Sequence, residues 1–409
     1  MTPNMPSRSF EIDVPEADLD RLRQKLDTTT FPDELDNAGW DMGVPLDEIK
    51  RLTAYWRGGF DWREQERRLN RHFKQFTVSV SVDGFEGLEI HYLHHTSKTP
   101  GAIPLLFIHG WPGSFLEATK LIPLLTNGDG DKPVFDVVAP SLPNFGFSSG
   151  VKKRGFGLHQ YAEAMHKVMT ALGYTEYVTQ GGDWGSLISR LMAHKYPSSI
   201  KAIHLNIIPL RFPKPWEQPL FYLTDILPIP FSPHRKAYLS TVWTYLTKGN
   251  GYATQQATRP QTLGYGIHDS PVALLAWIYD KLHLWTDKYP WTDDEILTWV
   301  SIYLFSRGGP AASVRIYYES AEGGTLLDSM NPVPKGVKVG VAQFRGEIMR
   351  WPMSWVRLLG GEAVRAKEFD VGGHFAAWEV PELLAAELRG MFGRDQDAFG
   401  VVGGKSGFS

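Results

Sequence analysis

Two segments of the chain place a nucleophilic side chain between glycines in the pattern G-x-nucleophile-x-G, which forms the nucleophile elbow of a hydrolase when it joins a strand directly to a helix. The first segment, residues 146–150, carries Ser148 and is a literal G-x-S-x-G. It does not meet the structural condition, because the preceding strand is expected to end near Ala139 and the next helix to begin near Leu158. We therefore interpret Ser148 as a loop serine.

The second segment, residues 181–185, carries Asp183 and meets this condition. It follows an expected strand at 177–179 and leads straight into an expected helix at 186–196. Glycines on both sides of the motif permit the close backbone approach and unusual dihedral angles that an elbow needs. The alternative is that Asp183 only caps the helix, but capping does not need the flanking glycines. The pattern favours Asp183 as the nucleophile.

Two further segments stand where such an elbow needs its partners. Residues 109–114 follow the first core strand, where a loop supplies a backbone N–H to the oxyanion hole, so the backbone groups of Trp111 and Trp184 are expected to be the paired donors. Residues 372–375, G-G-H-F, follow the last strand, where the chain order nucleophile, acid, histidine places the base at His374. The alternative is a loop histidine without a catalytic role.

The acid that orients this histidine is expected at the end of the preceding strand. Glu347 follows the apolar run 339–344 and fits that position. Asp370 is too close to His374 in sequence and lies on the following strand. The alternative for Glu347 is a solvated surface residue, because charged side chains are mostly exposed.

An aspartate nucleophile indicates displacement at a saturated carbon. A serine that attacked an epoxide or an alkyl halide would form an ether, which activated water does not hydrolyse, whereas a carboxylate forms an ester that water can hydrolyse. His374, oriented by Glu347, would activate that water, and the oxyanion hole would stabilise the tetrahedral intermediate.

Opening an epoxide also requires an acid for the departing oxygen, whereas a halide leaves without a proton. Tyrosine suits this task because its ordinary pKa near 10 keeps it protonated at neutral pH. The candidates are Tyr252, ahead of the segment T-R-P-Q-T, and Tyr317, in I-Y-Y-E. Both lie in the segment 213–321, between the earlier and the later core strands. From the residues alone, the alternative of packing tyrosines with satisfied hydroxyls stays open.

The elements that must position these residues follow an α/β pattern. After amphipathic helices at 16–70 and a hairpin at 76–82 and 88–94, short apolar strands alternate with helices from residue 103 onward, which predicts βαβ units on a mostly parallel sheet. Strand character pauses over residues 213–321 and returns at 337–344 and 366–369, so the intervening segment is expected to be an inserted lid. The glycine-rich residues 400–409 are expected to be disordered.

Composition limits the class of function. The formal charge of -3, from 42 basic and 45 acidic residues, provides no electrostatic footprint for nucleic acid. The chain has no cysteine, which excludes disulfides and cysteine-held metals and fits the cytoplasm. Residues 1–14 have no continuous apolar core of a signal peptide, and no apolar run approaches the roughly 20 residues of a spanning helix. With neither a metal-binding nor a dinucleotide motif, we expect no metal and no cofactor.

Taken together, these motifs resemble the epoxide hydrolases of the α/β-hydrolase superfamily, in the branch that contains microsomal, juvenile hormone and fungal enzymes. The resemblance covers nearly the whole chain. It rests on F-P-D at 31–33, G-F-D-W-R at 59–63, residues 109–114, residues 181–186, Tyr252 with residues 258–262, residues 316–319, and residues 372–375.

The resemblance implies an α/β-hydrolase core with an inserted α-helical lid and an N-terminal meander. The expected divisions are residues 1–90 for the meander and first hairpin strand, 91–212 and 322–409 for the core with a flexible tail, and 213–321 for the lid.

The resemblance also implies the roles of the site residues. Asp183 is the nucleophile, His374 the base, Glu347 its acid, and Tyr252 and Tyr317 donate to the epoxide oxygen. The spacing tyrosine, one residue, glutamate selects Tyr317 over Tyr318. The chain starts directly at the meander, without the anchor of microsomal members, so it is similar to the soluble kind; its acid is a glutamate, as in microsomal members, where many soluble relatives have aspartate.

The expected function is hydrolysis of epoxides to vicinal diols, with detoxification as its setting, and with a small apolar epoxide and water as the partners. The alternatives are a haloalkane dehalogenase with the same nucleophile and a ligand-binding protein without catalysis. Lid aromatics such as Phe221, Trp243 and Trp277 favour either an apolar substrate or an ordinary lid core. The sequence leaves the oligomeric state open, with a homodimer as the candidate assembly.

Overall fold

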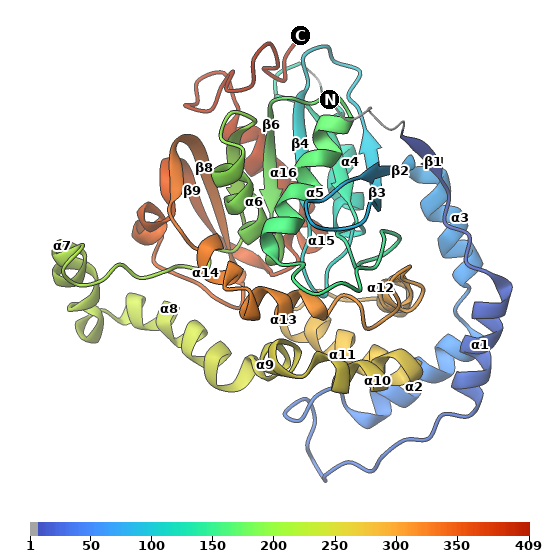
Figure 1. Ribbon diagram of the computed structural model, residues 1–409. Helices are drawn as coiled ribbons and strands as arrows, with labels where there is room; N and C mark the ends of the chain where they lie inside the picture. The colour runs from blue at the N-terminus through green and yellow to red at the C-terminus, as the bar shows by residue number, and fades with distance from the viewer. Residues whose placement is uncertain (1–6, 129) are drawn as a thin grey trace.

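A nine-stranded sheet forms the centre of the protein in the computed structural model, which describes residues 7–128 and 130–409. Its order is β1-β2-β3-β5-β4-β6-β7-β8-β9 (Figure 1). The strands are β1 (Arg8–Phe10), β2 (Gln75–Val80), β3 (Leu88–His95), β4 (Ile103–Ile108), β5 (Phe135–Pro140), β6 (Tyr177–Gly181), β7 (Ile200–Leu205), β8 (Val333–Gly346) and β9 (Gly360–Gly373). The β1 to β3 section and the β3–β5 pair are antiparallel, and all pairs from β5 to β9 are parallel. The predicted mostly parallel sheet is confirmed; β1 was not expected.

Helices cover both faces of the parallel section. Every residue of β4 and β5 is buried, as expected of strands with apolar neighbours on both sides. Helix α5 packs beside α6 on one face, and α15 and α16 pack beside α4 on the other (Figure 1). The bounds of these helices are α4 (Glu117–Thr126), α5 (Leu158–Ala171), α6 (Trp184–Lys195), α15 (Ala376–Glu379) and α16 (Pro381–Met391).

The chain between β7 and β8 forms a helical layer along one edge of the core (Figure 1). Its α-helices are α7 (Pro219–Phe221), α8 (Pro233–Thr244), α9 (Gly251–Thr258), α10 (Pro260–Asp269), α11 (Pro271–Leu284), α12 (Asp293–Leu304), α13 (Arg315–Glu322) and α14 (Thr325–Ser329). A π-helical turn, Tyr245–Gly249, joins α8 to α9. Among the described residues, none of the helices combines the length and apolar character that crossing a bilayer requires.

The N-terminal helices α1 (Glu16–Asp27), α2 (Leu46–Gly58) and α3 (Trp62–His72) pack outside this layer (Figure 1). The ring of Trp40 stacks on that of His283, with the centroids 3.5 Å apart. The hydroxyl of Tyr55 donates to Asp294 at 2.8 Å. The N-terminal segment therefore supports α11 and α12 from the solvent side.

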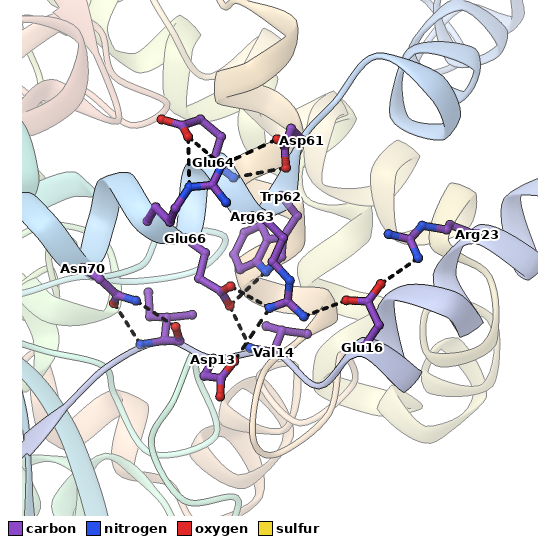
Figure 2. A network of polar contacts seen from close by, with 12 residues as sticks. Asp13, Val14, Glu16, Arg23, Asp61, Trp62, Arg63, Glu64, Glu66 and Asn70 are labelled. Atoms are coloured by element: carbon purple, nitrogen blue, oxygen red, sulfur yellow. Dashed lines mark hydrogen bonds and ion pairs between the residues drawn. The ribbon is translucent and has the colours of Figure 1, made fainter.

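Glu66 of α3 connects this helix to the segment at the beginning of α1, around Val14 and Glu16 (Figure 2). Its buried carboxylate accepts hydrogen bonds from the backbone of Val14 at 2.7 Å and from Arg63 at 2.6 Å, and Arg63 also pairs with Glu16 at 2.9 Å. Asp61 caps α3 by accepting from the backbone of Glu64. The segment G-F-D-W-R therefore has a structural role. Residues 1–6 of the expected meander lie outside the described residues.

The C-terminal residues differ from the expectation of a disordered tail. Val402 and Phe408 are buried, and Gly407 donates to the carbonyl of Gly101 at 2.8 Å and accepts from the backbone of Val134 at 2.9 Å. Gly407 itself has a φ of 82°. The glycines thus serve tight turns that fasten the tail at the beginnings of β4 and β5, whereas their abundance had suggested flexibility.

Candidate active site

Asp183 stands on a sharp turn between β6 and α6, with φ 48° and ψ -127°. Such a left-handed conformation is strained for a residue with a side chain and is typical of a nucleophile elbow. A Cβ on Gly185 would lie 1.9 Å from the carbonyl oxygen of Ile108, and one on Gly181 would lie 2.4 Å from the oxygen of Gly185. The glycines are therefore required by the crossing of backbones at the turn. Asp183 occupies the N-cap position of α6 but makes no capping hydrogen bond with its side chain.

One oxygen of this carboxylate is held by the loop after β4. The backbone N–H of Trp111 donates to Oδ1 of Asp183 at 2.8 Å, and a Cβ on Gly110 would lie 2.1 Å from the same oxygen. The N–H of Trp184 belongs to the first turn of α6, where backbone donors have no intrahelical acceptor. The two expected oxyanion donors thus come from the loop after β4 and from the first turn of α6, which meet at Asp183.

Helix α12 holds the Trp111 loop in place. The indole of Trp299 donates to the carbonyl of Pro112, and the hydroxyl of Tyr303 donates to the carbonyl of Gly113, both at 2.5 Å. Both side chains are buried. The helical layer therefore braces the oxyanion loop.

His374 and Glu347 reach Asp183 from the ends of β9 and β8. Nε2 of His374 lies 3.5 Å from Oδ2 of Asp183, and its Nδ1 lies 2.8 Å from Oε1 of Glu347. The backbone N–H of Ile348 donates to the same Glu347 oxygen, which fixes the carboxylate. Asp370, the rejected candidate, is exposed on β9.

The surroundings of His374 favour its charged form. Burial alone lowers the pKa of His374, but the carboxylates of Glu347 and Asp183 outweigh burial and raise the pKa well above its ordinary value. Glu347 is 3% exposed, so little solvent screens this pair.

Tyr252 and Tyr317 face each other from α9 and α13, with ring centroids 5.9 Å apart. The ring of Tyr252 stacks on Trp111 at 5.3 Å, and that of Tyr317 meets Trp184 edge-on at 4.7 Å. Burial raises the pKa of both tyrosines well above the ordinary value, so both are protonated at neutral pH. The hydroxyl of Tyr318 instead accepts from Arg154 at 3.3 Å.

The hydroxyls of Tyr252 and Tyr317 differ in their hydrogen bonds. That of Tyr317 has no hydrogen-bond partner within the part of the chain that the structure describes, although it is buried. That of Tyr252 lies 3.1 Å from the hydroxyl of Tyr245, a residue that sequence reasoning did not single out. An unpaired buried donor is costly unless a ligand satisfies it.

A cavity of about 390 Å³ opens onto this group. Asp183 and the tyrosines 245, 252 and 317 contribute to its wall, and the rest is mainly aliphatic, including Leu187, Ile207, Leu246, Leu326, Met330 and Ile348. The aromatic residues Phe221, Trp243 and Trp277 do not line it. The apolar character of the cavity therefore comes from residues that the sequence did not indicate.

Glu117 is a buried carboxyl group at the start of α4, which sequence reasoning also missed. Burial raises its pKa to about 8, with the charge of Asp183 acting in the same direction. A Cβ on Gly113 would lie 2.0 Å from its Oε1. The signal in the sequence is S-F-L-E at 114–117, which is typical of a helix N-terminus and does not predict burial.

Ser148 is a structural residue of the loop after β5. It is fully buried; its hydroxyl donates to the carbonyl of Ser141 at 2.7 Å and accepts from the backbone of His91 at 2.9 Å. The interpretation of Ser148 as a loop serine is confirmed.

The chain is similar to known proteins in both sequence and structure. Residues 7–118 match the family described as "Epoxide hydrolase N terminus", and residues 103–248 match "alpha/beta hydrolase fold". The chain is 34% identical to "Epoxide hydrolase 1" of Sus scrofa, over 94% of this chain and 88% of that protein. Two solved structures are similar at 30% identity and 94% coverage of this chain: the juvenile hormone epoxide hydrolase of the silkworm Bombyx mori (TM-score 0.83, 93% of that chain) and the epoxide hydrolase of Aspergillus niger (TM-score 0.80, 95% of that chain).

Proposed function

The chain belongs to the epoxide hydrolases, and from this premise we propose that Asp183, His374 and Glu347, with Tyr252 and Tyr317, convert an apolar epoxide to a vicinal diol through an ester on Asp183. The reaction divides into formation of the ester and its hydrolysis.

In the first step, the epoxide lies in the cavity, and a carboxylate oxygen of Asp183 attacks one of its two ring carbons. The breaking C–O bond leaves negative charge on the epoxide oxygen, and Tyr252 and Tyr317, which line the same cavity, donate to it. Tyr317 is ready for this role because its hydroxyl is buried and has no partner among the described residues. The loss of a preorganised donor to such a charge typically costs about 10²- to 10³-fold in rate.

In the second step, His374 removes a proton from water, which attacks the ester carbonyl. In the free protein the carboxylates of Glu347 and Asp183 together raise the pKa of His374 over the opposing effect of burial. Esterification removes the charge of Asp183, so the pKa of His374 falls once the ester has formed. The histidine therefore becomes neutral, and able to accept a proton from water, at the stage that needs a base, and Trp111 and Trp184 stabilise the tetrahedral oxyanion.

The observation that carries this proposal is the position of Asp183 between two sets of partners. Trp111 holds Oδ1 at 2.8 Å, His374 lies 3.5 Å from Oδ2, and the cavity with its tyrosine hydroxyls opens onto the same residue. The mainly aliphatic wall supports an epoxide with an apolar substituent.

A single-turnover reaction in H₂¹⁸O with enzyme in excess tests the covalent route. We expect the first diol to carry no label in its new hydroxyl and ¹⁸O to appear in the peptide that contains Asp183. Labelled diol with unlabelled Asp183 would show direct attack by water. Halide release from haloalkanes without diol from any epoxide of a panel would favour the dehalogenase alternative.

The lid function of residues 213–321, a homodimer and a cytoplasmic location remain predictions. The helical layer supports the lid role because it supplies Tyr245, Tyr252 and Tyr317 to the cavity. Light scattering coupled to size-exclusion chromatography would determine the assembly, and cell fractionation the location.

A further inference from the structure

A third tyrosine lies behind one of the two proposed acids. The hydroxyl of Tyr245 is 3.1 Å from that of Tyr252, and Tyr245 also lines the cavity that contains Asp183. Tyr245 is the first residue of the π-helical turn Tyr245–Gly249, which follows α8. Such turns redirect side chains and often occur at functional sites. The arrangement makes the two proposed acids unequal, because the hydroxyl of Tyr317 has no equivalent partner among the described residues.

The environments of the paired tyrosines differ in solvent exposure. Tyr252 is 5% exposed, whereas Tyr245 is half-buried and its neighbour Leu246 is 54% exposed. A phenolate is therefore less costly at Tyr245 than at Tyr252. The pKa values follow this order: burial raises the pKa of Tyr245 to about 12, and that of Tyr252 well above its ordinary value.

We propose that Tyr245 and Tyr252 form a proton relay, in which Tyr252 protonates the opening epoxide oxygen while Tyr245 protonates Tyr252. This inference rests on the proposed function and assigns Tyr245 as a residue that acts through Tyr252. Tyr317 then supplies a hydrogen bond to the oxygen without giving up its proton.

The protons and the charge of the relay balance over formation and hydrolysis of the ester. When Asp183 forms the ester and the C–O bond breaks, the oxygen takes the proton of Tyr252, Tyr252 takes that of Tyr245, and the negative charge initially on Asp183 ends on Tyr245. Hydrolysis of the ester by water regenerates the carboxylate and releases one proton through His374. That proton restores Tyr245, so the enzyme returns to its starting state.

A double-mutant cycle on the rate of ester formation tests the relay. All variants carry His374→Gln, and intact-mass spectrometry in single turnovers measures ester formation by itself. We expect Tyr245→Phe to slow this step about 10- to 100-fold, the range for loss of one hydrogen bond to a charged group. In a Tyr317→Phe background the effect should persist. In a Tyr252→Phe background it should disappear, because the residue through which Tyr245 acts is then missing.

A matched control and a second readout separate the relay from packing. The hydroxyl of Tyr222 donates to the carbonyl of Pro213 at 2.7 Å in the same helical layer, outside the cavity lining, so Tyr222→Phe should leave ester formation unchanged. Across styrene oxides with increasingly electron-withdrawing substituents, the effect of Tyr245→Phe should shrink as the oxygen needs less proton transfer. A packing defect would slow all of these substrates equally.

Three outcomes would overturn the relay. They are an equal effect of Tyr245→Phe in the Tyr252→Phe and Tyr317→Phe backgrounds, no effect of Tyr245→Phe alone, or a Tyr317→Phe variant that is slower than Tyr252→Phe. The last comparison decides the question even if Tyr245→Phe does not fold. Failure of the proposed function looks different, because the Tyr252→Phe, Tyr317→Phe double variant would then form ester at the normal rate or no ester would form at all.

Discussion

Nδ1 of His374 donates a hydrogen bond to Oε1 of Glu347 at 2.8 Å. A carboxylate has no donor, so the contact fixes a proton on Nδ1, and Nε2, which faces Asp183, is the nitrogen that can act as a base once it has lost its own proton. The contact also shows that the Glu347 side chain reaches the imidazole from the end of β8.

Glu347→Gln should slow hydrolysis of the ester, because a neutral amide no longer stabilises the imidazolium and can select the wrong tautomer. We expect a loss of up to about 10⁴-fold in that step, the size of loss seen when the acid of a catalytic triad is replaced by its amide. Ester formation should change far less. Stopped-flow measurement of the two phases distinguishes them, and equal slowing of both would contradict the assigned role.

Asp183→Ala should abolish turnover, and His374→Gln should accumulate an adduct equal to the epoxide in mass, because the ester then forms without a base to hydrolyse it. Intact-mass spectra at successive times provide the measurement. Ser148→Ala is the control, and it should remain active with stability lowered by about 1 to 3 kcal/mol from lost buried hydrogen bonds. An active Asp183→Ala variant and the lack of any adduct in His374→Gln would together refute both half-reactions.

Tyr252→Phe and Tyr317→Phe should each retain part of the activity, because one donor to the epoxide oxygen remains. The double variant should fall about 10²- to 10³-fold below the better single variant in steady-state epoxide turnover. Its thermal unfolding should be close to that of the parent, since phenylalanine has nearly the same volume. Near-normal turnover by the double variant would remove the tyrosines from the mechanism.

Glu117→Gln should stabilise the protein more at pH 9 than at pH 4.5. Burial raises the pKa of Glu117 from 4.5 to about 8, so between these pH values the folded protein keeps a proton that the unfolded chain has released. Stability therefore falls as pH rises through this window and levels off above it. Glutamine mimics the neutral form of Glu117 and does not lose stability in this way. The gain in the free energy of unfolding from Glu117→Gln should therefore be larger at pH 9 than at pH 4.5 by about 3 to 5 kcal/mol. Urea unfolding of both proteins at the two pH values gives the difference, and an equal gain at each would contradict a neutral buried Glu117.

Gly185→Ala should prevent formation of an active elbow, because the new Cβ would lie 1.9 Å from the carbonyl of Ile108. Gly266→Ala is the matched control, since its Cβ would meet no atom within 4 Å and it lies within α10. The control should gain up to about 1 kcal/mol from the better helix propensity of alanine. Soluble yield, circular dichroism and epoxide turnover compare the two, and an active Gly185→Ala variant would show that the elbow tolerates a side chain.

The sequence by itself predicted the succession of strands and helices from residue 103 onward and the turn that carries Asp183. A strand, a glycine-flanked aspartate and a helix follow one another within about twenty residues, so local periodicity and the conformational needs of the turn could be recognised together. His374 and Glu347 were predicted because each follows an apolar strand, and the carboxyl ends of parallel strands meet at one edge of a sheet.

Only the tertiary structure decided which residues complete the site. Seven residues of continuous α-helix would separate Tyr245 and Tyr252 by about 10 Å along the axis. Their hydroxyls meet because the helix changes to a π turn and a new helix begins at Gly251. The aliphatic cavity wall, the buried Glu117 and the fastened C-terminal residues likewise depend on segments distant in sequence, whose contacts are decided by packing and leave no signature in the local pattern of either segment.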